Sequence, residues 1–125
     1  MKTTKTVRKA GFTLVEIMIV VAIIGLLAAI AIPNFVRARA TSQANACINN
    51  LRQIDASINE WALEQGKQTG AQPVLNSDLT PYIKLNANGA IPGCPAQGTY
   101  TVFTVGATPQ VSCSLSTLNP PHKLP

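Results

Sequence analysis

Acidic side chains are scarce in this chain of 125 residues, and none follows Asp78. Calcium prefers carboxylate oxygens as ligands, so no calcium site is predicted beyond that residue. His122 is the only histidine, and the three cysteines contain no C-x₂-C pair, the spacing typical of many zinc sites. Because the cysteines and His122 fall on unrelated predicted elements, we predict no metal site and no cofactor.

The residues that usually carry catalysis are equally few. His122 lies in a proline-flanked tail, and the sequence has neither a nucleophile–base pattern nor a glycine-rich phosphate loop. Glu60 and Glu64 share a helix face, but two carboxylates at that spacing are typical of a solvated surface. The sequence therefore predicts that the protein is not an enzyme.

Positive charge gathers at the N-terminus. The formal net charge is +5, and four of the ten basic residues precede Gly11: Lys2, Lys5, Arg8 and Lys9. After Gly11, six basic residues face five acidic ones, which leaves a difference of +1 and no basic stripe for nucleic acid. We therefore predict no nucleic-acid partner. By the positive-inside rule, the leader lies in the cytoplasm and the chain after Pro33 lies outside it.

One long apolar run follows the basic leader: GFTLVEIMIVVAIIGLLAAIAIP, from Gly11 to Pro33. The 21 residues from Phe12 to Ile32 are long enough, at about 1.5 Å per residue, to span a hydrocarbon core of about 30 Å. An ordinary secretory signal is cut after its apolar stretch. Here the natural cut, between Gly11 and Phe12, precedes the stretch, so cleavage there removes the basic leader and keeps a membrane helix.

The chain divides into four predicted segments: a cleaved basic leader (residues 1–11), a transmembrane helix (12–33), an amphipathic continuation of that helix (34–65) and a small globular head (66–125). In the third segment, apolar residues recur in steps of three and four, the pattern of one helix face. They are Ala44, Cys47, Ile48, Leu51, Ile54, Ile58, Trp61 and Ala62. Membrane helices tolerate a proline kink, so we predict one helix from Phe12 to about Gln65, bent near Pro33 and ended by Gly66.

The head is predicted to contain a β-hairpin, which gives an α+β fold. Thr99–Val105 is rich in β-branched and aromatic residues, Gly106–Pro109 makes a turn, and Gln110–Ser114 returns as a second strand. A two-stranded hairpin is marginal by itself, so we expect it to pack on the apolar face of the long helix.

Two shorter parts of the head are predicted with less structure. A short turn is expected at Leu79–Ile83, with Ser77 or Asp78 as its capping residue. The tail, Asn119–Pro125, is expected to have little to fold with.

The hexapeptide Gly11-Phe12-Thr13-Leu14-Val15-Glu16, preceded by a basic leader and followed by an apolar run to Pro33, resembles the prepilin family. This family comprises type IV pilins and the pseudopilins of type II secretion systems, and the resemblance covers roughly residues 8–40. It implies that a prepilin peptidase cuts after Gly11 and methylates Phe12. It also implies a subunit that sits in the inner membrane as a single-pass protein with its head outside the cytoplasm. The subunit then assembles, with the inner-membrane machinery and with copies of itself or related pilins, into a periplasmic or extracellular filament.

Glu16 is the residue expected to govern assembly. A carboxylate costs about 2–3 kcal/mol at the centre of a bilayer, and less near the end of a helix. Pairing with the α-ammonium of Phe12 on a neighbouring subunit would offset this cost and fix the register between subunits. The alternative is that Glu16 reaches the membrane interface in a plain anchor.

Three further residues are expected to serve packing in the filament core. Ala22 and Gly25, together with Ala29, recur at steps of three and four, which allows helices to approach closely. Pro33 is expected to bend the helix.

The cysteines leave more than one pairing open. Cys94 and Cys113 flank the predicted hairpin, and a head outside the cytoplasm lies where disulfides persist. Closing that loop would contribute about 3 kcal/mol, and the resemblance supports this pair because pilins often carry a disulfide in the C-terminal region. A bond that involves Cys47, or no bond, remains open. Cys47 lies on the apolar helix face, where a buried small hydrophobe is expected.

Two other functions compete with a filament subunit. One is a secreted soluble binding module cut after Ala31, because Ala29-Ile30-Ala31 fits an ordinary signal cleavage site. The other is a plain single-pass membrane-anchored protein that keeps its leader. The three predictions differ in the mature N-terminus, whereas the helix alone does not separate a type IV pilus from a secretion pseudopilus.

Overall fold

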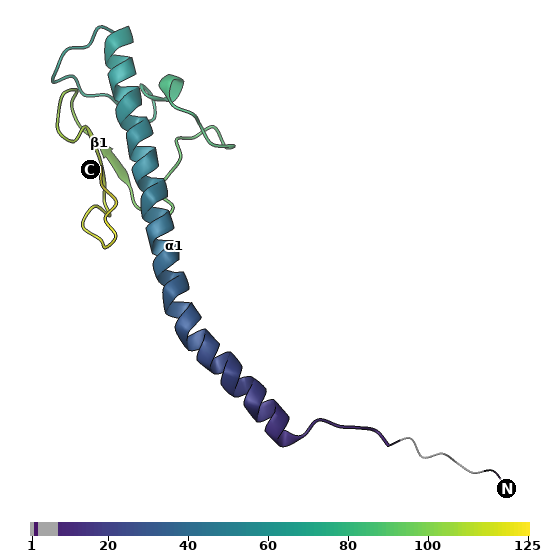
Figure 1. Cartoon of the computed structure of the whole chain (residues 1–125). Helices are drawn as coiled ribbons and strands as arrows, with labels where there is room; N and C mark the ends of the chain where they lie inside the picture. The colour runs from purple at the N-terminus through teal and green to yellow at the C-terminus, as the bar shows by residue number, and fades with distance from the viewer. Residues whose placement is uncertain (1, 3–7) are drawn as a thin grey trace. The chain divides into compact units, whose positions relative to one another are not determined.

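The computed structural model describes residue 2 and residues 8–125 (Figure 1). Its elements are helix α1 (Leu14–Glu64), the 3₁₀ turn η1 (Thr80–Tyr82) and strands β1 (Tyr100–Val102) and β2 (Val111–Cys113). The predicted α+β class, with one long N-terminal helix and a small C-terminal region containing a hairpin, is confirmed. The chain divides into two compact units, Met1–Val36 and Arg37–Pro125. Residues 1 and 3–7 of the predicted leader lie outside the described residues.

Helix α1 ends as the sequence predicts. The Gly66 N–H donates to the Leu63 carbonyl at 3.4 Å, and the Lys67 N–H donates to the Ala62 carbonyl at 2.8 Å. These are the two bonds of a Schellman cap, which satisfy the last helix carbonyls. Gly66 has a φ of 61°, a left-handed conformation that favours glycine. Pro33 lies inside the helix, and the bend predicted there stays a prediction.

The apolar face predicted for the second half of α1 is buried. Its buried residues are Ala44, Cys47, Leu51, Ile54, Ser57, Ile58, Trp61 and Ala62. Ile48 is only half-buried, and Ser57 takes a place that the apolar pattern did not include. The Ser57 hydroxyl donates to the Ile54 carbonyl at 2.7 Å, which explains how a polar side chain is satisfied in this interior.

The hairpin pairs β1 and β2 antiparallel, with Tyr100 opposite Cys113 and Val102 opposite Val111. Each strand has three residues, so both are shorter than predicted. The reason is that the backbone of Val105 pairs elsewhere: its N–H donates to the Ala71 carbonyl at 2.8 Å, and its carbonyl accepts from the Gly70 N–H at 2.9 Å. The connector after α1 thus takes bonds that a longer hairpin would have used.

The turn at η1 forms where it is predicted, but its predicted cap is wrong. The N-cap position is Leu79, which makes no side-chain capping bond. Asp78 instead accepts the Val74 N–H at its Oδ2 at a distance of 2.8 Å. The carboxylate closes the preceding turn, and is therefore not available to η1.

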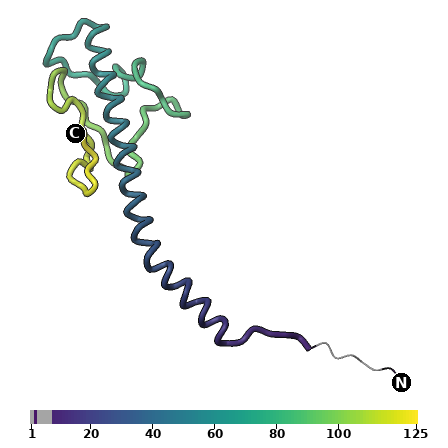
Figure 2. Tube along the Cα trace, viewed as in Figure 1, coloured from purple at the N-terminus to yellow at the C-terminus, as the bar shows by residue number. Residues whose placement is uncertain are grey.

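The core of the second unit lies between α1 and the segments that follow it. Figure 2 shows the C-terminal region, drawn green to yellow, running beside the teal second half of the helix. Leu79, directly before η1, and Val111 from β2 are buried against Leu51 and Ile54 in one apolar cluster. The helix face and the hairpin each supply one side of this core, so neither is left exposed to water.

The expectation for the tail is wrong. The His122 side chain is buried (the residue is 3% exposed), and the backbone N–H of His122 donates to the Leu115 carbonyl at 3.3 Å. Leu124 also packs on the apolar cluster. The tail therefore belongs to the folded head, because its apolar and imidazole side chains close an edge of the core.

Candidate functional site

The first turn of α1 is closed by a reciprocal pair of residues, Thr13 and Glu16. The Thr13 N–H donates to Glu16 Oε2 at 2.8 Å, and the Thr13 hydroxyl donates to the same oxygen at 3.0 Å. The Glu16 N–H donates in return to the Thr13 hydroxyl at 3.2 Å. This arrangement is a capping box, which satisfies backbone donors at a helix start. The pattern T-x-x-E before an apolar run is the sequence signal of a capping box, and it was not among the predictions above.

The predicted cleavage point lies just before this capping box. Gly11 and Phe12 are both exposed and belong to neither a helix nor a strand. A Cβ atom at Gly11 would meet nothing within 4 Å, and the Phe12 side chain is 87% exposed. The peptide bond between them is therefore open to another protein.

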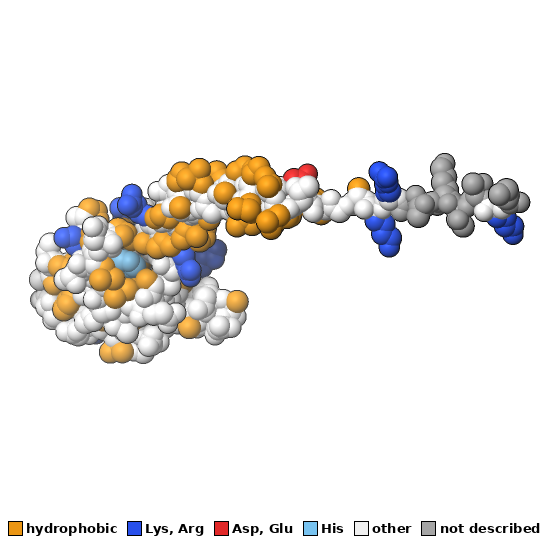
Figure 3. All heavy atoms as spheres, turned by 90° about the horizontal axis from the view of Figure 1, so that it is seen from below, with side chains coloured by type: hydrophobic (Ala, Val, Ile, Leu, Met, Phe, Trp, Pro, Cys, Tyr) orange, Lys and Arg blue, Asp and Glu red, His pale blue; other side chains and the backbone are white. Residues whose placement is uncertain are grey.

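The apolar run forms a helix that is bare of protein cover in the single chain. Figure 3 shows apolar side chains gathered over this part of the surface. From Phe12 to Val36, the exposed large apolar residues are Phe12, Leu14, Val15, Ile17, Met18, Ile19, Val20, Val21, Ile23, Ile24, Leu26, Leu27, Ile30, Ile32, Phe35 and Val36. We call this set the apolar sleeve. By length and composition, α1 can cross a membrane. A surface of this kind needs lipid or other apolar helices around it.

The residues predicted to serve packing lie along the same helix. Ala22 and Gly25 are exposed, and a Cβ atom at Gly25 would meet nothing within 4 Å. Nothing in this chain's own described residues therefore requires glycine there, whereas a closely packed neighbouring helix would. Pro33 lies two turns further on, inside α1. The structure thus spreads Ala22, Gly25 and Pro33 along the helix, away from Glu16, whose side chain bonds to Thr13.

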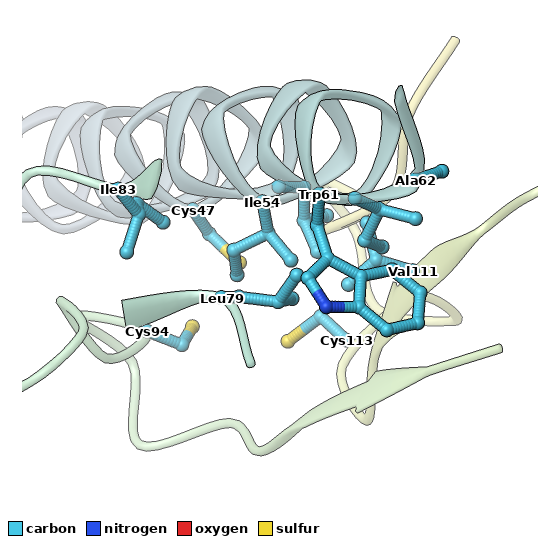
Figure 4. Close-up of a cluster of buried hydrophobic side chains, with 11 residues drawn as sticks. Cys47, Ile54, Trp61, Ala62, Leu79, Ile83, Cys94, Val111 and Cys113 are labelled. Atoms are coloured by element: carbon cyan, nitrogen blue, oxygen red, sulfur yellow. The ribbon is translucent and has the colours of Figure 1, made fainter. Parts of the chain in front are cut away.

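The other predicted site residues, Cys94 and Cys113, lie in the head. All three cysteines of the chain are buried free thiols in the structure, and the predicted bond between Cys94 and Cys113 stays a prediction. Figure 4 shows Cys47 projecting from α1 into the interior that Cys94 and Cys113 border from the other side. His122 joins them, so that four potential ligands from four segments meet. No local sequence pattern predicts this meeting, because no two of the four residues are close neighbours in the chain.

The environments of two of these thiols differ. Burial raises the pKa of the Cys47 thiol well above its ordinary value. Burial also acts to raise the pKa of the Cys94 thiol, but hydrogen bonds from the backbone N–H groups of Ala96 and Gly98 and from the Cys47 and Cys113 thiols together outweigh it, so this pKa lies below its ordinary value. The Cys94 sulfur is the better prepared of the two to carry negative charge.

A family model and several known proteins match part of this chain. The family model for the prokaryotic N-terminal methylation motif matches residues 7–32. The type IV major pilin protein PilA of Myxococcus xanthus is 57% identical over 47 residues, which are 38% of this chain and 21% of the relative. The chain is a prepilin-family protein.

Two other relatives match a larger share of this prepilin-family chain, but not its whole length. The type IV major fimbrial protein FimA of Dichelobacter nodosus is 48% identical over 60 residues, 48% of this chain and 38% of the relative. The fimbrial protein EcpB of Eikenella corrodens is 37% identical over 86 residues, 65% of this chain and 54% of the relative. The chain thus spans about half or less of the length of these curated relatives. No solved structure matches.

The motif of the family falls on the site described above. Residues 7–32 include Gly11, Phe12, Glu16, Ala22 and Gly25, whereas Pro33 and all three cysteines lie beyond them. The prepilin signal therefore concerns the apolar sleeve and its capped start. It says nothing about the interior of the head.

Proposed function

We propose that this chain is a structural, non-enzymatic subunit of a type IV filament. The observation that carries the proposal is the apolar sleeve, which is exposed along its whole length and follows a basic leader that ends in Gly11. A helix of this kind is stable in lipid, and it is equally stable where the same helices of other subunits replace the lipid. The head has its own buried core, so it stays folded in water both before and after other helices replace the lipid around the sleeve.

Processing comes first in the proposed mechanism. A prepilin peptidase cuts the exposed bond between Gly11 and Phe12, and the new N-terminal amine of Phe12 is methylated. The basic leader, which holds the N-terminus in the cytoplasm, is removed by this cut. The subunit then stays in the inner membrane through residues 12–33, with the head outside the cytoplasm.

Assembly then uses the carboxylate of Glu16. Both hydrogen bonds from Thr13 go to Oε2, so Oε1 can accept from a second donor. The α-ammonium of Phe12 on a neighbouring subunit is that donor in the proposed filament. The pair offsets the cost of placing a carboxylate among apolar helices, and it fixes how far one subunit is shifted along the filament from the next.

Among type IV filaments, we favour a pilus over a secretion pseudopilus. The relatives named above are a major pilin and fimbrial proteins. The partners are copies of this chain or related pilins, the prepilin peptidase and the inner-membrane assembly machinery. The filament is then periplasmic or extracellular.

The mass of the N-terminal peptide of the protein from its native host tests this function. A chain that starts at N-methylated Phe12 is expected. A chain that starts at Ile32 would mean a secreted soluble module, and an intact Met1 would mean a plain membrane anchor. Either of these results would overturn the proposal, because a filament subunit needs both the sleeve and a free amine at Phe12.

A further inference from the structure

Four side chains with metal-binding atoms converge inside the head. The sulfurs of Cys47, Cys94 and Cys113 and a ring nitrogen of His122 all lie within 4.8 Å of one another. Cys47 comes from α1, Cys94 from the loop before β1, Cys113 from the end of β2 and His122 from the tail. Each of the four residues is at most 6% exposed. We call this set the Cys₃His cluster.

We propose that the Cys₃His cluster binds one zinc ion and thereby ties the tail and hairpin to the long helix. Three thiolates and one imidazole are a common ligand set of closed, structural zinc sites, which are tetrahedral. On binding, each thiol releases its proton, so that three protons leave and the imidazole remains neutral. The zinc ion and three thiolates together carry a net charge of −1.

The spacing of the four atoms suits such a site. Zinc–sulfur bonds of about 2.3 Å and zinc–nitrogen bonds of about 2.0–2.1 Å place neighbouring ligand atoms of a tetrahedron about 3.5–3.8 Å apart. Cys94 Sγ and His122 Nδ1 are 3.3 Å apart, which is close to this value. The other pairs lie within the 4.8 Å limit, so the site closes around an ion by shifts of about 1 Å or less. Side-chain rotations of buried cysteines can supply shifts of this size.

A chain of hydrogen bonds leads to the sulfur of Cys47, as a buried anionic site requires. The Tyr100 hydroxyl donates to Cys47 Sγ at 3.6 Å, and the Asn50 amide donates to that hydroxyl at 3.2 Å. The Asn50 amide also donates to the Gly93 carbonyl at 3.1 Å, which ties it to the loop that carries Cys94. Such outer contacts orient ligands and stabilise their negative charge.

The sulfur of Cys113 occupies space that is free because Gly98 has no side chain. A Cβ atom at Gly98 would lie 2.6 Å from Cys113 Sγ, closer than real Cβ contacts allow. At Gly93 a Cβ atom would meet nothing within 4 Å. Glycine is therefore needed at Gly98 to leave room for the sulfur, and the nearby Gly93 offers a matched control.

A zinc site accounts for all four side chains, whereas a disulfide accounts for two. A bond between Cys94 and Cys113 would use two sulfurs and leave a third thiol and a buried imidazole beside them without a purpose. The buried His122 ring contacts Cys94 Sγ at 3.3 Å, and in a zinc site both of these atoms become ligands of the ion. The cluster lies in the unit Arg37–Pro125, so this inference is independent of filament assembly through the apolar sleeve.

Cobalt titration of the full chain tests the inference. The protein is held in detergent micelles, reduced and free of metal, and its three thiols are counted after denaturation. We expect one cobalt ion per chain, with the intense visible absorption of tetrahedral cobalt thiolate, and loss of this absorption when zinc displaces cobalt. Thermal unfolding should shift to a higher temperature with zinc. Absence of tetrahedral cobalt absorption, with all three thiols reduced, would overturn the proposal without any variant.

Variants then assign the ligands. We expect Cys47→Ser, His122→Asn and Gly98→Ala to weaken cobalt binding at least about tenfold, while Gly93→Ala binds like the unaltered chain. Circular dichroism confirms that each variant is folded before it is titrated. Equal weakening by Gly93→Ala and Gly98→Ala would contradict the proposed place of Cys113.

The protein from its native host gives the final decision. One zinc ion per chain by mass spectrometry of the metal content supports the cluster as a zinc site. A disulfide between Cys94 and Cys113 in that material would overturn it, because the two sulfurs cannot bind zinc while they are bonded to each other.

Discussion

Glu16 accepts two hydrogen bonds from Thr13 at one carboxylate oxygen, Oε2, at 2.8 Å from the backbone N–H and 3.0 Å from the hydroxyl. The carboxylate thus has a partner within its own chain, at the first turn of α1. In the proposed filament it has a second partner, the amine of a neighbouring subunit. The two roles differ in what they need: a helix cap needs a hydrogen-bond acceptor, whereas an ion pair needs the negative charge.

The first prediction separates these two roles. We expect Glu16→Ala and Glu16→Gln to prevent filament formation, because both remove the charge, although glutamine still accepts hydrogen bonds. Thr13→Ala removes the cap and leaves the charge, so filaments should still form. Electron microscopy of the cell surface, with the subunit counted in membranes by immunoblot, gives the result. Normal filaments with Glu16→Gln would show that the charge is not needed.

The second prediction concerns the core under the head. Leu51 is fully buried, whereas Leu63, on the same helix, is 84% exposed. Leu51→Ala should lower the free energy of unfolding of the head by about 2–5 kcal/mol, since it leaves a cavity. Leu63→Ala should change it by less than about 0.5 kcal/mol. Denaturant unfolding followed by the fluorescence of Trp61, the only tryptophan and a buried one, measures both. Similar losses for the two variants would mean that the helix face is assigned wrongly.

The third prediction concerns Gly98 in the metal-free, reduced chain. A methyl group there would press on Cys113 Sγ and on Leu115, whose Cγ would lie 3.0 Å away. We expect Gly98→Ala to destabilise the head by about 1–3 kcal/mol, the usual cost of overpacking. Gly93→Ala has open space and should be nearly neutral. The same fluorescence assay compares them, and a neutral Gly98→Ala would show that the hairpin and loop are further apart.

The fourth prediction concerns the end of α1. Gly66 is left-handed but has open space around its Cα atom, so a substitution there meets backbone strain and not crowding. Gly66→Ala should cost about 1–2 kcal/mol of unfolding free energy. Gly66→Asn should cost less, because asparagine tolerates this conformation better. If alanine and asparagine have equal effects, the Schellman cap does not govern this helix end.

Much of the fold follows from local patterns in the sequence. A helix repeats every 3.6 residues, so the apolar face from Ala44 to Ala62 and the cap at Gly66 are both readable from neighbours a few positions apart. The strands around Tyr100 and Val111 were placed by the same reasoning, but their lengths were not. Their ends depend on Val105, whose backbone pairs with Gly70 and Ala71, more than thirty residues away.

The candidate sites divide in the same way. The basic leader, the predicted cut before Phe12, the carboxylate at Glu16 and the apolar sleeve lie in one continuous stretch, and all four can be identified from the sequence alone. The capping box of Thr13 was also readable there, although it was missed.

The Cys₃His cluster was decided only by the tertiary structure. Cys47 and His122 are 75 positions apart (122 − 47), and no spacing rule links residues on a helix, a loop, a strand and a tail. Packing of the hairpin and tail on α1 brings the four side chains together. These segments bury the apolar face of the helix, which would otherwise be exposed to water. The same packing buries His122, although the proline-rich tail was expected to have little to fold with. Local interactions thus determined the elements and the filament signal, whereas burial of the long helix face determined which distant side chains meet.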